Sequence, residues 1–320
     1  MAVLAAGTAL RWPVDTQPGV NVRVAAVPVV DSSITPAGFG IVWFAGWHDG
    51  FAGIFRIDTA SGEVRHFPDL HADREVPLVA GADGLLVGSQ SGSPYMLVRP
   101  DGTHGGRLFP QRPIYPVGPN RAWFIDGGLE QRDARLVDLR TSEDLAAITI
   151  EHDEWVVGVE EERILVRSRL TAGTFWRAVD GTVTRATGDA VLVFRDGAWV
   201  ETSCDERLAC RALYVSPIEQ IFAAPGAFGL DGWYELSPTR PAVALVGTRL
   251  AVFDFTSGRT TDLGRLRGFG GSLYGTVSWT PDGESIVWVD ERGVMAWTLG
   301  SVEPAVLLPS NDIEGSVAAG

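Results

Sequence analysis

The sequence contains no lysine, since all 26 of its basic residues are arginine. This absence excludes Schiff-base catalysis and the phosphate-binding lysine of P-loop proteins. Histidine is also scarce, with five residues in 320, and none stands at the spacing of a His-Glu-x-x-His metal site. The Gly-x-Ser-x-Gly sequence of serine hydrolases is missing as well. These absences favour a protein that binds over one that catalyses.

Long hydrophobic runs and basic clusters are also missing. No run reaches the 18 or more apolar residues that a transmembrane helix needs. The 40 acidic residues against 26 basic ones give a net charge of −14. Because nucleic-acid binding depends on neutralising phosphates, this balance argues against a nucleic-acid partner. Residues 1–19 begin with an apolar, small-residue stretch, which we interpret either as the remnant of a signal peptide or membrane anchor or as a loose N-terminal segment.

The chain has only two cysteines, Cys204 and Cys210, which enclose a five-residue loop between two strand-like segments. Thiols that flank so short a hairpin loop face each other across neighbouring strands, at a separation that a disulfide bridges. A metal site would need more ligands, and no histidine lies within 50 residues. We therefore predict a structural disulfide and an oxidising, extracytoplasmic location. Two buried free thiols in a cytosolic protein are the alternative.

What the sequence does have is a repeat. A short apolar strand followed by a turn marked by Gly or Asp occurs seven times, about every 40 residues. The repeated strands are centred on Phe55, Leu97, Leu136, Trp176, Leu213, Val252 and Ala296. This period, with several short strands in each unit and no sustained helical periodicity, is typical of β-propeller blades. We predict an all-β fold, a seven-bladed β-propeller of four-stranded antiparallel blades, in which most of the 11 tryptophans fill gaps between blades.

The repeat predicts one domain over residues 20–309, followed by a polar, loose tail at residues 310–320. Residues 20–24 are a candidate for a strand that closes the last blade and so hides the sheet edges of an open array. The last blade is the clearest. There, Pro281-Asp282-Gly283 forms the turn between the first two strands, because proline presets φ and glycine takes the left-handed position.

Residues 278–293 resemble the PD40 repeat of TolB-like β-propellers, in which a Pro-Asp-Gly turn leads into an apolar strand and an arginine-containing loop. The match is partial around Pro100-Asp101-Gly102. The hairpin between Cys204 and Cys210 is similar to one in uncharacterised, exported and membrane-anchored propeller proteins of high-GC bacteria. The resemblance implies an extracytoplasmic seven-bladed propeller used for binding or scaffolding.

Loops between second and third strands supply the candidate site. Trp47, His48 and Asp49 lie on such a loop, which in a propeller usually borders the ligand-binding face; a solvated loop histidine is the alternative for His48. Other loops of this kind place an acid near an arginine and would form a rim of mixed charge. Its residues are Glu130, Arg132, Arg207 and Arg292. We interpret the rim as a docking surface for a protein or glycan, with charged tips inherited through the repeat as the alternative.

Two functions are consistent with these features. The first is a non-catalytic extracytoplasmic propeller, a monomeric scaffold that binds a protein, small-molecule or glycan partner without a metal or cofactor, with a membrane tether outside the given chain as an option. The second is a propeller enzyme, a lyase or glycan-acting hydrolase with two carboxylates or a His–carboxylate pair over the central channel. The missing catalytic motifs favour the first.

Overall fold

The computed structural model of the chain describes most residues from 38 onward. The described ranges are 22–23, 27–28, 38–67, 78–81, 84–87, 96–99, 103–104, 112–117, 121–127, 132–139, 141, 143–226, 228, 233–266, 276–310 and 313–320. The predicted N-terminal segment, residues 1–19, lies outside them.

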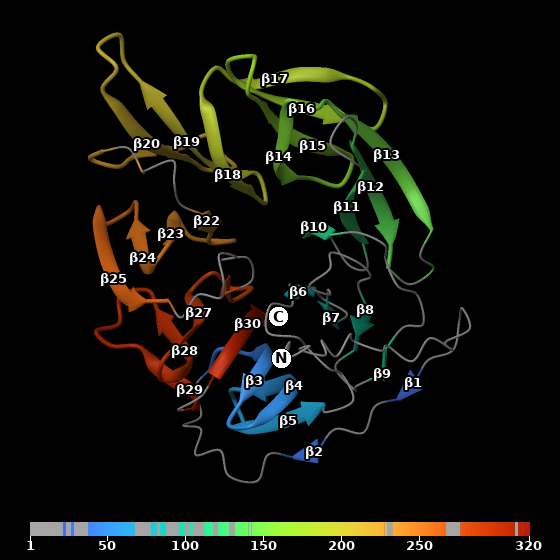
Figure 1. Cartoon of the computed structure of the whole chain (residues 1–320). Helices are drawn as coiled ribbons and strands as arrows, with labels where there is room; N and C mark the ends of the chain where they lie inside the picture. Colours follow the sequence, from blue (N-terminus) through green and yellow to red (C-terminus); the bar gives the residue numbers. More distant parts are fainter. Residues whose placement is uncertain are drawn as a thin grey trace, which may run out of the picture.

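All regular structure in the described ranges is β-strand, and the strands form seven antiparallel sheets arranged around a common centre (Figure 1). Five sheets have four strands in chain order. The first of these contains β10 (Arg112–Pro116), β11 (Arg121–Gly127), β12 (Arg132–Asp138) and β13 (Asp144–Ile150). The second contains β14 (Glu154–Val159), β15 (Arg163–Ser168), β16 (Thr174–Ala178) and β17 (Val183–Thr187). The third contains β18 (Ala190–Arg195), β19 (Ala198–Cys204), β20 (Cys210–Val215) and β21 (Ile221–Ala223).

The last two four-stranded sheets follow the same order. One contains β22 (Trp233–Leu236), β23 (Ala242–Val246), β24 (Arg249–Asp254) and β25 (Arg259–Arg265). The other contains β26 (Val277–Trp279), β27 (Ser285–Asp290), β28 (Gly293–Thr298) and β29 (Ala305–Pro309), in agreement with the strands predicted around the Pro-Asp-Gly turn. In each sheet the first strand lies nearest the centre (Figure 1). The fold is therefore a β-propeller.

Two sheets have five strands because a distant segment adds to each of them. One has the order β1 (Val22–Arg23), β9 (Thr103–His104), β8 (Met96–Val98), β7 (Gly84–Val87) and β6 (Leu78–Gly81). The other has the order β2 (Val27–Pro28), β5 (Glu63–Phe67), β4 (Phe51–Asp58), β3 (Ile41–His48) and β30 (Ile313–Ala319). The N-terminal strands β1 and β2 thus pair with outer strands (Figure 1), and the prediction that residues 20–24 close the last blade is wrong.

The prediction of a loose tail at residues 310–320 is also wrong. β30 pairs antiparallel with β3, from Ile313 opposite His48 to Ala319 opposite Val42, and it lies near the centre of the molecule (Figure 1). Its small residues suit this crowded place, because a Cβ added to Gly315 would lie 2.2 Å from the carbonyl oxygen of Ala45. The composition that suggested a loose tail is the one that lets the strand fit.

The hydrophobic cores lie between neighbouring sheets. One core joins β22–β24 to β26–β28, and another joins β11–β13 to β15. Buried tryptophans contribute to both, and their indole N–H groups bind backbone carbonyls of the adjacent sheet: Trp279 donates to Glu235 at 2.9 Å, and Trp123 donates to Glu160 at 2.8 Å. These tryptophans fill gaps between sheets, as the sequence predicted.

The predicted disulfide is confirmed. Cys204 and Cys210 are the last pair of the β19–β20 ladder, with their Cα atoms 4.0 Å apart and their sulfur atoms bonded. Closing a loop this short stabilises the fold by roughly 2 kcal/mol in the chain-entropy description. The disulfide therefore fixes the loop between the second and third strands of its sheet.

Candidate functional site

The turns between second and third strands lie at the same end of each sheet as the connection to the next sheet, because successive antiparallel strands reverse direction. We call this end the hairpin face. Four described segments on it are the Asp49-Gly50 turn, residues 151–153 between β13 and β14, residues 169–173 between β15 and β16, and residues 205–209 inside the disulfide loop. Three of the four rim residues predicted from the sequence, Arg132, Arg207 and Arg292, lie at this end of their sheets.

Three of the predicted residues come together where β29 leads into β30. His48 Nε2 donates to the Pro309 carbonyl at 3.2 Å, and the Ser310 hydroxyl donates to Asp49 Oδ1 at 2.8 Å. The backbone N–H of Ser310 donates to the Arg292 carbonyl at 3.1 Å. His48 is buried, so the alternative of a solvated loop histidine is wrong.

The serine, aspartate and histidine of this cluster are not arranged as a catalytic triad. In a triad the histidine stands between the serine and the acid. Here the Ser310 hydroxyl donates directly to Asp49, and His48 Nε2 is 3.8 Å from Asp49 Oδ2 while bound to a carbonyl. The cluster instead ties the connection between β29 and β30 to the β3–β4 turn.

Arg292 has a second contact, and the other predicted residues that the structure describes lie at further points of the hairpin face. Arg292 is held by the buried Asp290, with Nη2 2.5 Å from Oδ2. Arg132, at the start of β12, donates to the backbone carbonyl of Glu154. Arg207 is exposed inside the disulfide loop, and Trp47 is half-buried near the end of β3. Glu130 lies outside the described residues. The structure thus places Arg132 and Arg207 on two other sheets.

Behind His48, the buried His66 on β5 stacks on Phe55 with ring centroids 4.4 Å apart, and its Nε2 donates to the Ala52 carbonyl at 3.1 Å. Burial lowers the pKa of His66 below its ordinary value of 6.5, because desolvation penalises the charged ring. The neighbouring His48 also lowers this pKa, and the hydrogen bond to Ala52 opposes the shift.

The lowered pKa of His66 predicts a loss of stability in acid. The unfolded chain takes up a proton below about pH 6.5 while the folded protein keeps His66 neutral, so the free energy of unfolding falls as the pH decreases from there to the folded pKa. In His66→Gln, which keeps an N–H donor but does not titrate, we expect the melting temperature to fall less over this interval. His152→Gln, at an exposed histidine, should retain the wild-type dependence. Identical pH profiles for His66→Gln and the wild-type protein would contradict the assignment.

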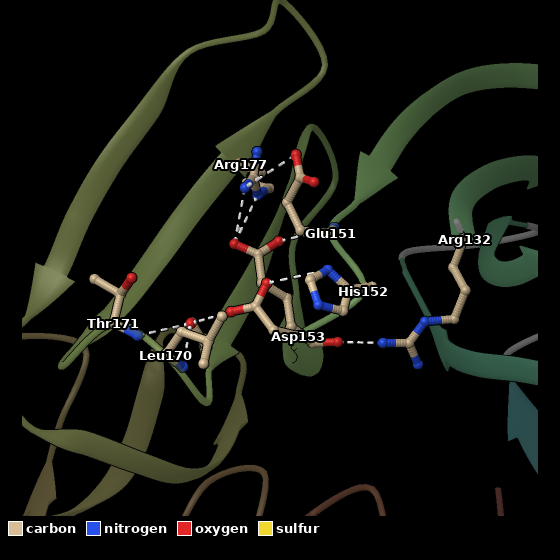
Figure 2. Close-up of polar contacts among 9 residues, drawn as sticks. Arg132, Glu151, His152, Asp153, Leu170, Thr171 and Arg177 are labelled. Atoms are coloured by element: carbon tan, nitrogen blue, oxygen red, sulfur yellow. Dashed lines mark hydrogen bonds and ion pairs between the residues drawn. The ribbon is translucent and has the colours of Figure 1, made fainter. Parts of the chain in front are cut away.

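A polar cluster on the hairpin face is built around Glu154, the buried first residue of β14, and Figure 2 shows the residues that surround it. Arg177 on β16 donates to Glu154 Oε1 through Nε at 3.2 Å and through Nη2 at 2.8 Å. Glu154 Oε2 accepts the backbone N–H of Glu151 at 3.2 Å, and the Glu154 carbonyl accepts from Arg132 of the neighbouring sheet. Glu154 therefore links the β13–β14 turn to β16 through its carboxylate, and to β12 of the neighbouring sheet through its backbone carbonyl.

Asp153, on the same turn, braces the β15–β16 hairpin. It accepts the Ser168 hydroxyl, whose oxygen in turn accepts the backbone N–H groups of Leu170 and Thr171, both at 2.9 Å (Figure 2). The hydrogen bond from Ser168 holds the pKa of Asp153 below its ordinary value of 3.8. Asp153 and Glu154 are thus both engaged by groups of the protein itself, which leaves neither as a free general acid or base.

A tryptophan and two arginines adjoin this cluster. Trp155 on β14 is half-buried and lies directly opposite Arg167 on β15. The guanidinium carbon of Arg167 is 5.1 Å from the centre of the indole ring, and that of Arg169 is 5.6 Å from it. Both contacts are within the range of cation–π attraction.

Sequence reasoning missed this part of the face. The residues concerned are Glu151, Asp153, Glu154, Trp155, Arg167, Arg169 and Arg177. One usable signal was the pair of arginines around Ser168 in an otherwise acidic chain. The ion pair of Glu154 with Arg177 could not be found, because its partners are on different strands of unknown register.

A second missed signal is a tryptophan followed two residues later by an acid. Both side chains then lie on one face of a strand, so the indole N–H reaches the carboxylate. Three such pairs form this bond: Trp199 with Glu201 at 2.9 Å, Trp233 with Glu235 at 2.9 Å, and Trp288 with Asp290 at 3.3 Å. Burial raises the pKa of Glu235, and the hydrogen bond from Trp233 and the charge of Arg195 act against it.

Within the described ranges, no three His, Cys, Asp or Glu side chains are grouped so that they could hold a metal ion. The same part of the chain has no helix of the length and hydrophobicity needed to cross a membrane.

Comparison with known proteins places the fold but no family. No protein family matches the sequence, and no curated protein does. A functionally unknown protein from Desulfotomaculum acetoxidans DSM 771 is similar in structure, with a TM-score of 0.52 and 12% identity over 88% of this chain and 99% of that chain. TolB from Acinetobacter baumannii has a TM-score of 0.46 and 12% identity, covering 86% and 80%. Hsv2 from Kluyveromyces lactis has a TM-score of 0.40 and 14% identity, covering 71% and 76%. At 12% identity the likeness to the Desulfotomaculum protein concerns the fold alone.

Proposed function

We propose that the protein is a seven-bladed β-propeller that acts outside the cytoplasm as a non-catalytic scaffold and binds a partner through its hairpin face. The seven antiparallel sheets support the blade number. The bond between Cys204 and Cys210 supports an oxidising compartment, because structural disulfides are rare in the cytosol.

The observation that carries the binding role is a set of exposed apolar side chains at turns of the hairpin face. Phe51, Leu170 and Leu208 are 63%, 78% and 83% exposed, and each adjoins or lies within a turn between second and third strands. Exposed apolar side chains can mark interaction sites, and those at the opposite end of the sheets provide the comparison for these three.

The best fixed of the three is Leu208, which lies inside the disulfide loop. Its φ of 60° is in the left-handed region, which a leucine rarely adopts. The loop holds it there through the bond from the Leu208 N–H to the Asp205 carbonyl at 2.9 Å and the bonds from the N–H groups of Arg207 and Ala209 to the Asp205 carboxylate. A strained residue kept at an exposed tip supports a binding role there.

The charges of the described hairpin face support binding over catalysis. Glu154 is paired with Arg177, Asp290 is paired with Arg292, and His48 is bound to a backbone carbonyl. These groups order the turns around them. Because they are already bound to other groups of the protein, they are better suited to shaping a binding surface than to catalysis.

Partner capture from the cell envelope tests this function. We expect the wild-type protein to retain a partner that the triple variant Phe51→Ser, Leu170→Ser, Leu208→Ser retains at least about tenfold less, because interface energy is concentrated in a few apolar anchors. The partner would be identified by mass spectrometry and its affinity measured again with purified protein.

The matched control is a triple variant of exposed apolar residues at the opposite end of the sheets, in turns between third and fourth strands: Val179→Ser, Ile218→Ser and Val302→Ser. This variant should bind like the wild-type protein. Equal retention by all three proteins, or loss only in the control, would show that the hairpin face is not the binding surface.

A further inference from the structure

Two positively charged side chains lie beside Trp155, and no described acid forms an ion pair with either of them. Arg167 and Arg169 both lie against the indole ring, and in the described part of the chain neither guanidinium has a hydrogen bond or an ion pair. The backbone N–H of Arg169 donates to the Asp153 carbonyl at 3.0 Å, so the β13–β14 turn holds this residue in place through its main chain.

The neighbouring acids are already occupied. Glu154 is bound by Arg177, and Asp153 is bound by the Ser168 hydroxyl. Glu151, which is exposed, has its carboxylate 3.9 Å from Arg177. No acid of this cluster therefore forms an ion pair with either of the two arginines beside Trp155.

Arg167 is the more informative of the two arginines because it is half-buried. Desolvation lowers its pKa, and no acidic neighbour contributes an opposing shift. Leaving a charge partly desolvated without a partner costs free energy. A chain with a net charge of −14 has many carboxylates that could have filled this position.

We propose that Trp155, Arg167 and Arg169 form a binding site for the oxyanion of a small ligand, either a carboxylate or a phosphate. The guanidinium fork matches the two oxygens of such a group, and Arg is more weakly hydrated than Lys, so it gives up water readily. The indole ring supplies apolar surface beside it. The inference rests on the proposed function, since it gives the chemistry of a ligand for the hairpin face.

Calorimetric titration at low salt tests the site with three probes: a galacturonic acid oligomer, inorganic phosphate and a neutral glucose oligomer. We expect at least one of the two anions to bind and the neutral oligomer not to bind. The anion that binds more tightly then decides between carboxylate and phosphate. Arg167→Gln and Arg169→Gln should each weaken binding about tenfold, the value of one charge-assisted hydrogen bond.

Arg259→Gln is the matched control, because Arg259 is an exposed arginine on β25 of another sheet, and it should bind like the wild-type protein. Circular dichroism checks that each variant is folded. Arg169 is exposed, so Arg169→Gln decides the question even where Arg167→Gln destabilises the protein. The proposal is contradicted if neither anion binds, or if Arg167→Gln and Arg169→Gln both bind the anion as tightly as the control does.

The test separates this inference from the proposed function. Loss of the partner in the Phe51, Leu170, Leu208 variant without any anion binding would leave the scaffold function standing and remove the oxyanion site. Anion binding that needs Arg167 and Arg169, in a protein whose partner capture does not depend on the hairpin face, would support the site and contradict the scaffold function.

Discussion

Gly315→Ala is expected to lower the free energy of unfolding by about 3 kcal/mol, the upper end for overpacking a filled interior. The added Cβ would lie 2.2 Å from the Ala45 carbonyl oxygen and 2.5 Å from Phe44 Cε2. The carbonyl cannot retreat easily, because Ala45 belongs to β3 and is paired on both sides, with Ser316 of β30 and with Ile54 of β4. The strain therefore falls on the contact that holds β30 in place.

Gly226→Ala provides the control for Gly315. A Cβ at Gly226 meets nothing within 4 Å, and its φ is not in the left-handed region. We expect this variant to differ from the wild-type protein by less than about 0.5 kcal/mol. Urea unfolding followed by tryptophan fluorescence measures both. Similar midpoints for the two variants would show that β30 is not packed as tightly as the structure has it.

Glu154→Gln is expected to destabilise the protein by about 3 kcal/mol, because removing one partner of a buried ion pair leaves the other charge uncompensated. The Glu154 side chain is 8% exposed and that of Arg177 is 21% exposed. Because glutamine keeps the shape of the residue, the decrease in unfolding free energy measures the effect of the lost charge and not that of a cavity. The same variant should loosen the β13–β14 turn, since Glu151 donates to the same carboxylate.

A surface pair with the same geometry is the control for Glu154. Arg249 donates to Asp262 Oδ2 through Nε at 3.1 Å and through Nη2 at 2.6 Å, but the two side chains are 55% and 53% exposed. Asp262→Asn should therefore cost less than about 1 kcal/mol. The double variant Glu154→Gln, Arg177→Gln should recover part of the loss, because no unpaired charge is left. Equal costs for Glu154→Gln and Asp262→Asn would contradict a special role for the buried pair.

The sequence predicted those parts of the fold that depend on local chemistry. The residues Pro281-Asp282-Gly283 form a turn through their own backbone preferences, and the strands on either side of it were predicted correctly. The disulfide also followed from local order, because Cys204 and Cys210 flank a single hairpin. In both cases the residues that decide the structure are neighbours in the chain.

The parts that the sequence did not reveal depend on contacts between distant segments. His48 is buried because it meets Pro309, 261 residues away. β30 contains several small residues, which have low strand propensity, and at Gly315 a residue with a Cβ would collide with β3. The group around Trp155 depends on the register of β14 and β15, which places Arg167 directly opposite the indole.

The pairing of β30 with β3 has a consequence for biogenesis. During synthesis, β3 leaves the ribosome more than 200 residues before its inner neighbour exists, so its sheet waits with an open edge while the other sheets form. Contacts this distant in sequence make folding slow, and the nascent chain is most prone to aggregation during that delay. A chaperone that shields the edge of β3 until β30 arrives would therefore raise the yield of native protein more than one that acts on any later strand.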